Sequence, residues 1–128
     1  MAKIIALTNQ KGGVGKTTSS VNIAASLAVS EFKTLIIDMD PQANASTGIS
    51  EIIINKSGYN IYDTLVGQIP IKEVISKTEF KYLDSVLSTN DLVGAEIELV
   101  SVIGRELELK KALKTVKKKY DYIIIGAG

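Results

Sequence analysis

The hydrophobic residues of the chain fall into short, unbroken runs separated by polar and glycine-rich segments. The runs within Lys3–Thr8 and Thr34–Asp38 are apolar without alternation, which is typical of strands covered on both faces of a parallel sheet. Between them, the segment Lys16–Val29 has the spacing of a helix, and its apolar face consists of Val21, Ala24, Ala25 and Ala28. The chain therefore opens with a strand, a loop, a helix and a strand, which together form a βαβ unit.

The remainder of the chain repeats this alternation of strands and helices. Asp40–Ser50 is polar, contains Pro41 and Gly48, and is predicted to be a loop. We expect two further strands, at Leu83–Leu87 and Tyr120–Ile125, and helices at Ile61–Val66, Ile71–Ser76, Leu92–Val100 and Gly104–Lys119. This alternation predicts an α/β fold with a mainly parallel sheet and helices on both faces.

Composition narrows the chemistry that such a fold can perform. The chain has 128 residues, which is enough for one domain, and its net charge of +1 gives no overall field for nucleic acid or membranes. It has neither cysteine nor histidine, so thiolate and imidazole chemistry are excluded within this sequence. No apolar run approaches the ~18 residues of a membrane span and the N-terminus lacks a signal-peptide pattern, so we expect a cytoplasmic protein.

The glycine-rich segment between the first strand and the first helix has the composition of a phosphate-binding loop. Glycines allow backbone N–H groups to turn inward around phosphate oxygens, and the start of the following helix adds unpaired donors. Lys16 is placed to reach the terminal phosphates, and the Thr17 hydroxyl suits Mg²⁺, which prefers oxygen ligands. The complete segment is Lys11, Gly12, Gly13, Val14, Gly15, Lys16, Thr17 and Thr18.

This segment departs from the general P-loop pattern at one position. The pattern G-x-x-x-x-G-K-[ST] requires glycine where this chain has Gln10, although the G-K-T that follows is intact. A simple glycine turn that caps a helix is the alternative interpretation. The strand–loop–helix context favours phosphate binding.

With Lys11 in the loop, the sequence resembles the deviant Walker A family, and within it the ParA/Soj partition ATPases. The deviant loop K-G-G-x-G-K-[ST]-[ST] matches Lys11–Thr18, and D-x-D-P-Q-x-N matches Asp38–Asn44 after the second strand. Two supporting matches are Gly94–Leu99, read G-A-E-I-E-L, and Tyr120–Ile125, read Y-D-Y-I-I-I. The resemblance extends over essentially the whole chain and implies a P-loop NTPase fold.

The resemblance also implies roles for individual residues. It makes ATP and Mg²⁺ the expected ligands and Lys16 a catalytic phosphate-binding residue. Lys11 would be a signature lysine that contacts the nucleotide of the facing subunit in an ATP-dependent homodimer. Asp40 would orient the attacking water, and Asp38 would lie near the metal together with Thr17. For both aspartates, a plain turn residue at a strand end is the alternative interpretation.

At the level of the whole protein, the resemblance implies an ATPase that acts in chromosome or plasmid segregation. Full-length relatives dimerise with ATP, bind non-specific DNA on the nucleoid, and are stimulated by a ParB/Spo0J-type partner protein. Two alternatives remain. One is a truncated remnant with weak or no nucleotide binding and no catalysis. The other, less favoured, is a MinD-like membrane-associated ATPase, which predicts an amphipathic C-terminal helix.

The chain departs from the family pattern in its length, at position 126 and at position 31. Residues 1–128 correspond to the N-terminal half of the ParA-type domain, truncated after the fourth expected strand. Gly126 stands where the family has the Walker B aspartate. The family strand order, third–second–fourth–first, would leave Ile4–Leu7 as an unpaired apolar edge, so we expect self-association. Glu31 stands where the family has a helix-capping glycine, and we expect a slightly different helix exit.

A run of lysines precedes the last expected strand. Because glutamates lie just before it and no aromatic residues interleave, a solvated helix face is the favoured interpretation, and a DNA-contacting surface is the alternative. The run consists of Lys110, Lys111, Lys114, Lys117, Lys118 and Lys119.

Overall fold

The computed structural model describes residues 2–8, 14–40, 44–66, 69–89 and 102–127. The strands are β1 (Lys3–Thr8), β2 (Thr34–Asp38), β3 (Ile53–Asn55), β4 (Ile75–Thr78), β5 (Leu83–Val86) and β6 (Tyr122–Ala127). The α-helices are α1 (Val14–Val29), α2 (Asn44–Ile49), α3 (Ile61–Leu65), α4 (Ile71–Val74) and α6 (Val102–Leu113). Two 3₁₀ turns complete the description, η1 (Ser50–Ile52) and η2 (Lys117–Lys119).

All of these strands belong to one six-stranded sheet with the order β1-β6-β2-β5-β4-β3. The strands β1, β6, β2 and β5 run parallel to one another, β4 pairs antiparallel with β5, and β3 pairs antiparallel with β4. The expected order of the third, second, fourth and first strands is the observed order of β5, β2, β6 and β1. The prediction of an α/β fold with a mainly parallel sheet is therefore confirmed.

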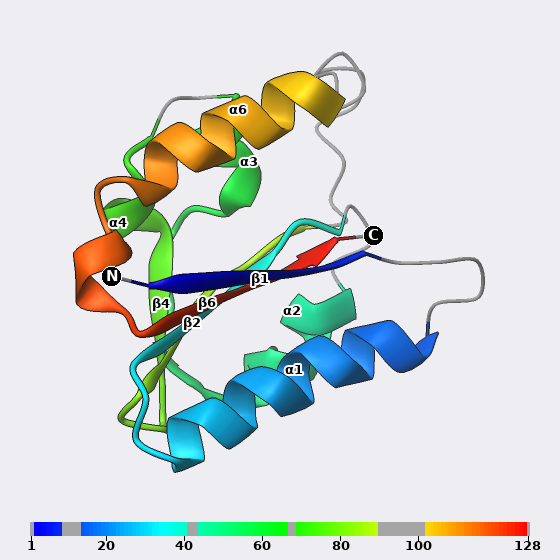
Figure 1. The fold of residues 1–128 in the computed structure, drawn as a ribbon, viewed down its shortest axis with the longest axis vertical. Helices are drawn as coiled ribbons and strands as arrows, with labels where there is room; N and C mark the ends of the chain where they lie inside the picture. The colour runs from blue at the N-terminus through cyan, green and yellow to red at the C-terminus, as the bar shows by residue number, and fades with distance from the viewer. Residues whose placement is uncertain (1, 9–13, 41–43, 67–68, 90–101, 128) are drawn as a thin grey trace.

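Helices cover both faces of the sheet (Figure 1). On one face, Leu35, Ile37 and Ile123 pack in a core with residues of α3, α4 and α6. On the other, Ile36 and Ile124 pack against α1 and Ile49 of α2. Successive strand residues thus enter opposite cores, which explains why the sequences of β2 and β6 are apolar at every central position.

The structure corrects the prediction for the segment after β2. Asp40–Ser50 is not wholly a loop, because residues 44–49 form α2, whose Ala45 and Ile49 are buried. The predicted helix Ile71–Ser76 ends at Val74, and the chain continues as β4, which pairs with β5 and β3. β3 was not predicted either. These short strands are stabilised by their sheet partners rather than by local pattern, which is why periodicity did not reveal them.

The other element predictions differ from the structure mainly at their ends. The predicted helix Gly104–Lys119 begins earlier, at Val102, and ends at Leu113, after which i→i−3 hydrogen bonds tighten residues 114–116 into turns before η2. The strand expected at Tyr120–Ile125 runs from Tyr122 to Ala127. The predicted helix Leu92–Val100 lies outside the described residues.

The exit of α1 differs from the expectation at Glu31. Glu31 has a φ of 67°, its N–H donates to the Ala28 carbonyl at 3.0 Å, and the Phe32 N–H donates to the Leu27 carbonyl at 3.0 Å. These two bonds define a Schellman motif with Glu31 at its left-handed position, which glycine occupies most easily. The expectation of a different helix exit is wrong. The chain leaves α1 through the ordinary Schellman geometry, and Glu31, which has a Cβ, adopts the left-handed conformation there.

We therefore expect Glu31→Gly to stabilise the chain by about 1 kcal/mol, because the left-handed strain of a residue with a Cβ is removed. The midpoint of thermal unfolding would rise by on the order of 4 °C. Glu31→Ala is the matched control, since it removes the same carboxylate and keeps the Cβ. If alanine stabilised the chain as much as glycine, the gain would come from charge and not from the backbone.

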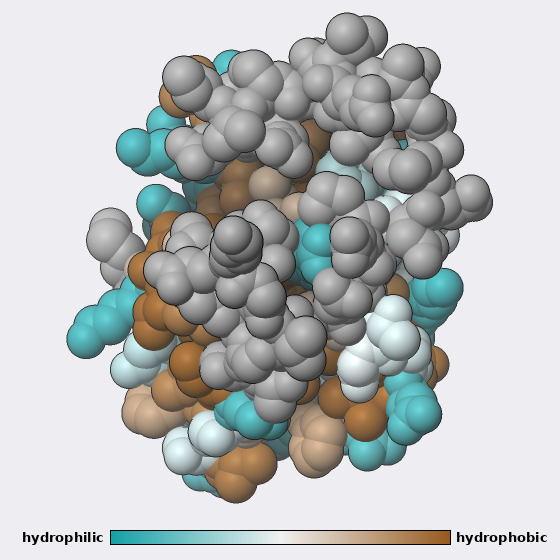
Figure 2. Space-filling model, turned by 90° about the vertical axis from the view of Figure 1, so that its right-hand side faces the viewer, coloured by the Kyte–Doolittle hydropathy of each residue, from teal (hydrophilic) through white to brown (hydrophobic). Residues whose placement is uncertain are grey.

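Strand β1 lies at one end of the strand order, and its outer side has no partner among the described residues. Ile4 and Ile5 are 42% and 36% exposed, whereas their neighbours on β6, Ile123 and Ile124, are both 0% exposed. Hydrophobic surface gathers on the left side of the space-filling view, where β1 forms the edge of the sheet (Figure 2). Among the described residues, no helix is long and apolar enough to cross a bilayer.

Candidate phosphate-binding site

The site is built at the carboxyl ends of three neighbouring strands, β1, β6 and β2. Gly126 of β6 lies between the other two strands, in register with Leu7 of β1 and with Asp38 of β2. The Met39 N–H donates to the Gly126 carbonyl at 2.7 Å, so the segment after β2 is fastened to β6. Ligands of open α/β sheets bind at this edge, because the loops that follow parallel strands meet there.

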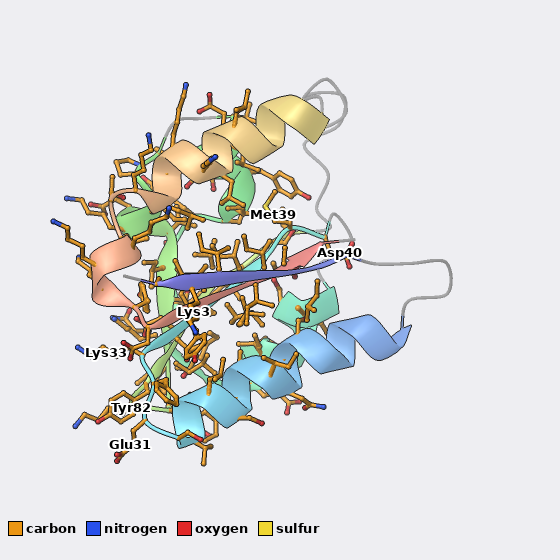
Figure 3. All side chains as sticks on the ribbon, viewed as in Figure 1. Lys3, Glu31, Lys33, Met39, Asp40 and Tyr82 are labelled. Carbon is orange, nitrogen blue, oxygen red and sulfur yellow. The ribbon has the colours of Figure 1, made fainter. Side chains whose placement is uncertain are left out.

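Helix α1 begins beside these strand ends. The structure places the backbone of Val14, Gly15, Lys16, Thr17 and Thr18 at the start of α1, while Lys11, Gly12 and Gly13 lie outside the described residues. The start of α1 and Asp40 lie on the same side of the molecule, beyond the strand ends (Figure 3). The first four N–H groups of a helix have no intrahelical partner, so this end of α1 favours an anion.

Asp38 is the most strongly anchored carboxylate of the site. It is 3% exposed, and its Oδ1 accepts a hydrogen bond from the Asp40 N–H at 2.8 Å. Its Oδ2 accepts from the Ser46 N–H at 2.8 Å and from the Ser46 hydroxyl at 2.7 Å. Because Ser46 lies in the first turn of α2, the Asp38 carboxylate caps that helix. A carboxylate offers about four acceptor positions, and donors among the described residues take three of them, which leaves one for a further donor such as metal-bound water.

A second serine joins this network from the end of β5. The Ser88 N–H donates to the Ser46 hydroxyl at 2.7 Å, and the Ser88 hydroxyl donates to the Asp40 carbonyl at 2.7 Å. The backbone of Asp40 is therefore held at its N–H by Asp38 and at its carbonyl by Ser88. Asp40 itself is 8% exposed. Sequence analysis missed Ser46 and Ser88, and no local pattern could have found them, since the Ser46–Ser88 contact spans 42 positions.

Opposing effects act on the ionisation of Asp38. Burial raises the pKa of its carboxyl above the ordinary 3.8, the hydrogen bonds from Ser46 and from the Asp40 N–H lower it, and the neighbouring Asp40 charge raises it further. Burial is the largest effect, so the pKa is raised overall. A cation placed close by would favour the charged form, and Mg²⁺ often binds proteins through only one or two carboxylates together with substrate phosphates. The residues present thus fit a divalent cation that is held jointly with phosphate groups.

Gly126 of β6 lies between β1 and β2, at the position where the sequence resemblance implies a Walker B aspartate. A Cβ at this position would lie 3.2 Å from the Ser20 hydroxyl and 3.6 Å from the Ser20 Cβ. Ser20 lies on α1, about one turn after Thr17. A side chain at position 126 would therefore point toward α1, and glycine supplies no carboxylate at this position.

The sequence of the chain is similar to those of several known proteins. The profile described as the AAA domain matches residues 2–128. The chain is 50% identical over 125 residues to the chromosome partitioning protein ParA of Myxococcus xanthus, and 50% identical over 127 residues to the sporulation initiation inhibitor protein Soj of Bacillus subtilis. These matches cover 98% of this chain but 44% and 49% of the relatives, so the chain spans about half their length.

Solved structures with the same fold include nucleotide-bound proteins. A putative plasmid partition protein from Borrelia burgdorferi bound to AMPPNP superposes with a TM-score of 0.80 and 33% identity, over 99% of this chain and 52% of that one. Cobyrinic acid a,c-diamide synthase from Mycobacterium smegmatis, with a bound ATP analog and magnesium, gives a TM-score of 0.79 and 29% identity. That match covers 98% of this chain and 50% of the synthase.

Proposed function

The chain belongs to the AAA domain family as a relative of the ParA and Soj partition proteins, and from this premise we propose that it binds ATP with Mg²⁺. The observation that supports this most is that the start of α1 and the Asp38–Asp40 turn lie on the same side of the molecule, at the carboxyl edge of the sheet. An anion-binding helix end beside two buried aspartates suits a phosphate chain that carries a divalent cation.

The proposed mechanism assigns each residue one task. The backbone N–H groups of residues 12–18 and the Lys16 ammonium neutralise the phosphates. The Thr17 hydroxyl would ligate Mg²⁺, and Asp38 would accept from its water shell through the position that Ser46 and Asp40 leave open. Asp40 would position the attacking water, and its backbone is already held at both ends.

The wider role follows from the relatives and is proposed for the longer proteins that they represent. Residues 1–128 would form the N-terminal half of a ParA-type ATPase domain that acts in chromosome or plasmid partition in the cytoplasm. Lys11 would reach the nucleotide of the facing subunit in an ATP-dependent homodimer. A ParB-type partner would stimulate hydrolysis, and DNA would be bound by full-length relatives.

Calorimetric titration of the purified chain with Mg-ATP tests the proposal, with Lys16→Ala as the critical variant. We expect saturable binding by the unchanged chain and a loss of affinity of about a hundredfold in Lys16→Ala, because a lysine that pairs with phosphates in a concave site contributes on the order of 3 kcal/mol. The measurement is the dissociation constant at fixed Mg²⁺.

Lys110→Ala is the matched control, since it removes an exposed lysine of α6, on the opposite face of the sheet from α1. Its affinity should equal that of the unchanged chain. Circular dichroism shows whether each variant is folded. A folded chain that does not bind Mg-ATP would contradict the proposal and favour the remnant without nucleotide binding.

A further inference from the structure

Asp38, Asp40, Ser46 and Ser88 are connected by a closed ring of hydrogen bonds, which we call the Asp38–Ser88 ring. The Asp38 Oδ1 accepts from the Asp40 N–H at 2.8 Å, and the Asp40 carbonyl accepts from the Ser88 hydroxyl at 2.7 Å. The Ser88 N–H donates to the Ser46 hydroxyl oxygen at 2.7 Å, and the Ser46 hydroxyl donates to the Asp38 Oδ2 at 2.7 Å. The ring joins the ends of β2 and β5 to the first turn of α2.

The direction of every hydrogen bond in the ring follows from its donor and acceptor types. A backbone N–H can only donate, and an ionised carboxylate can only accept. The proton of the Ser46 hydroxyl is therefore directed at Asp38, and that of the Ser88 hydroxyl at the Asp40 carbonyl. Since a hydroxyl has a single proton, neither serine can donate to a phosphate while the ring is closed. We infer that both serines act on the orientation of other groups.

The ring is also shielded from solvent. All of its members are buried, so a hydrogen bond that is lost leaves a polar group without an equivalent partner. The carboxylate of Asp38 is held at both oxygens, and the turn at Asp40 is held at its N–H and at its carbonyl. Groups held in this way keep one geometry before a ligand binds, which is what a preorganised site requires.

Each serine acts mainly on one of the two aspartates. Two of the donors to Asp38 belong to Ser46, namely its N–H and its hydroxyl, so the orientation of this carboxylate depends on Ser46. The Asp40 turn, in contrast, is fastened to β5 through the Ser88 hydroxyl. Substitution of one serine and then of the other can therefore separate the contributions of Asp38 and Asp40.

We propose that Ser46 and Ser88 are positioning residues of the ATP site, in which Ser46 orients the Asp38 carboxylate and Ser88 holds the turn that carries Asp40. This inference rests on the proposed function, which places Asp38 near Mg²⁺ and assigns the attacking water to Asp40. Loss of the Ser46 hydroxyl then weakens the part of nucleotide binding that depends on Mg²⁺. Loss of the Ser88 hydroxyl slows hydrolysis and leaves binding unchanged.

Calorimetric titration of the full chain with ATP, once with Mg²⁺ and once with EDTA, tests the role of Ser46. The ratio of the two dissociation constants measures how much of the affinity depends on the cation. Ser46→Ala should reduce this ratio about tenfold, as expected for a residue that orients a metal-associated group, and should change the constant in EDTA less than twofold. Ser46→Thr keeps the hydroxyl and should restore the ratio. A hollow of about 360 Å³ beside Ser46 and Ser88 leaves room for the added methyl group.

Single-turnover hydrolysis and amide hydrogen exchange test the role of Ser88. Ser88→Ala should slow hydrolysis of bound Mg-ATP about tenfold with an unchanged dissociation constant, because a displaced water-orienting group affects the chemical step alone. In the nucleotide-bound chain, the Asp40 N–H should exchange faster in Ser88→Ala than in the unchanged chain. Ser88→Thr keeps the hydroxyl and should reverse both effects.

Thr78→Val is the matched control for a hydrogen-bond loss outside the ring. The buried Thr78 hydroxyl donates to the Leu83 carbonyl at 2.7 Å and accepts from the Phe80 N–H at 3.1 Å. It thus has the same types of partner as a ring serine, but it lies at the opposite end of β5 from Ser88. The control should lose stability in urea unfolding as the serine variants do, and it should keep both the Mg²⁺ dependence and the hydrolysis rate.

The outcomes separate this inference from the function on which it rests. A folded, unchanged chain that does not bind ATP overturns both. If the chain binds Mg-ATP, the positioning roles are overturned when Ser46→Ala keeps the Mg²⁺ dependence or when Thr78→Val loses as much as the serine variants. The role of Ser88 is overturned when Ser88→Ala hydrolyses ATP as fast as the unchanged chain, or when the unchanged chain binds ATP without hydrolysing it.

Discussion

Asp38→Ala is expected to lower the free energy of unfolding by about 3 kcal/mol. The reason is that three donors lose their acceptor together: the Asp40 N–H, the Ser46 N–H and the Ser46 hydroxyl. Each lies in a buried setting, where an unsatisfied polar group costs about 1–3 kcal/mol. Relief of the buried negative charge offsets part of this loss.

The substitution also removes hydrogen bonds that link three parts of the fold. Asp38 ends β2, Ser46 begins α2, and Ser88 follows β5 and bonds both Ser46 and the Asp40 carbonyl. Without the carboxylate, α2 loses its N-terminal cap and the Asp40 turn loses one of its two anchors. We therefore expect faster hydrogen exchange at Asp40 and Ser46 in any variant that remains folded.

Asp121→Ala is the control for burial. Asp121 also accepts from a backbone N–H, that of Lys33, at 2.9 Å, but it is exposed, so water can replace it and the expected loss is below about 1 kcal/mol. Urea unfolding of both variants at pH 7 gives the comparison. Equal losses would mean that burial does not control the contribution of Asp38. Asp38→Asn should lie between the two, because an amide accepts at one end and donates at the other.

Some parts of the fold could be predicted from the sequence, and others could not. β2 and β6 were predictable because both of their faces are buried, which leaves an unbroken apolar signature in β2 and in Tyr122–Ile125. The strand order was predictable only through the family resemblance, since periodicity does not determine which strands are neighbours. α2 was not predictable, because its capping group, Asp38, lies in another element and its own sequence contains Gly48.

Residues that act together were predictable where they are close in the sequence. The phosphate loop, Asp38 and Asp40 occur in contiguous motifs, so their residues were identified from the sequence. By contrast, the lysines around the start of β2 come from Lys33, from β4 and the turn after it, and from η2, segments that only the fold brings together. In the sequence, Lys118 and Lys119 were indistinguishable from the solvated lysines of α6.

The second large effect is expected at the β1 edge. We expect the nucleotide-free chain to self-associate at concentrations on the order of 100 μM, and Ile4→Lys to keep it monomeric. Ile4 and Ile5 are consecutive, so they face opposite sides of the sheet, and both are exposed. The helices that cover the rest of the sheet therefore leave β1 partly exposed on both faces, at Ile4 and Ile5. Sedimentation velocity over a concentration series measures the effect.

The backbone of β1 supports the same expectation. The Lys3 N–H donates to the Asp121 carbonyl at 2.9 Å, so the polar groups of Lys3, Ile5 and Leu7 point toward β6. Those of Ile4 and Ala6 point outward, where another strand could pair with them. Ala6→Pro removes one outward N–H without removing a donor to β6, and it should also suppress self-association.

The opposite edge of the sheet provides the control for Ile4→Lys. Ile54 of β3 is 69% exposed, more than Ile4, but β3 has only three residues. A strand this short offers few hydrogen bonds to a partner, and proteins commonly protect their edges in this way. Ile54→Lys should therefore leave self-association unchanged. If instead it were as effective as Ile4→Lys, association would depend on exposed apolar area in general, and the free backbone of β1 would not be its cause.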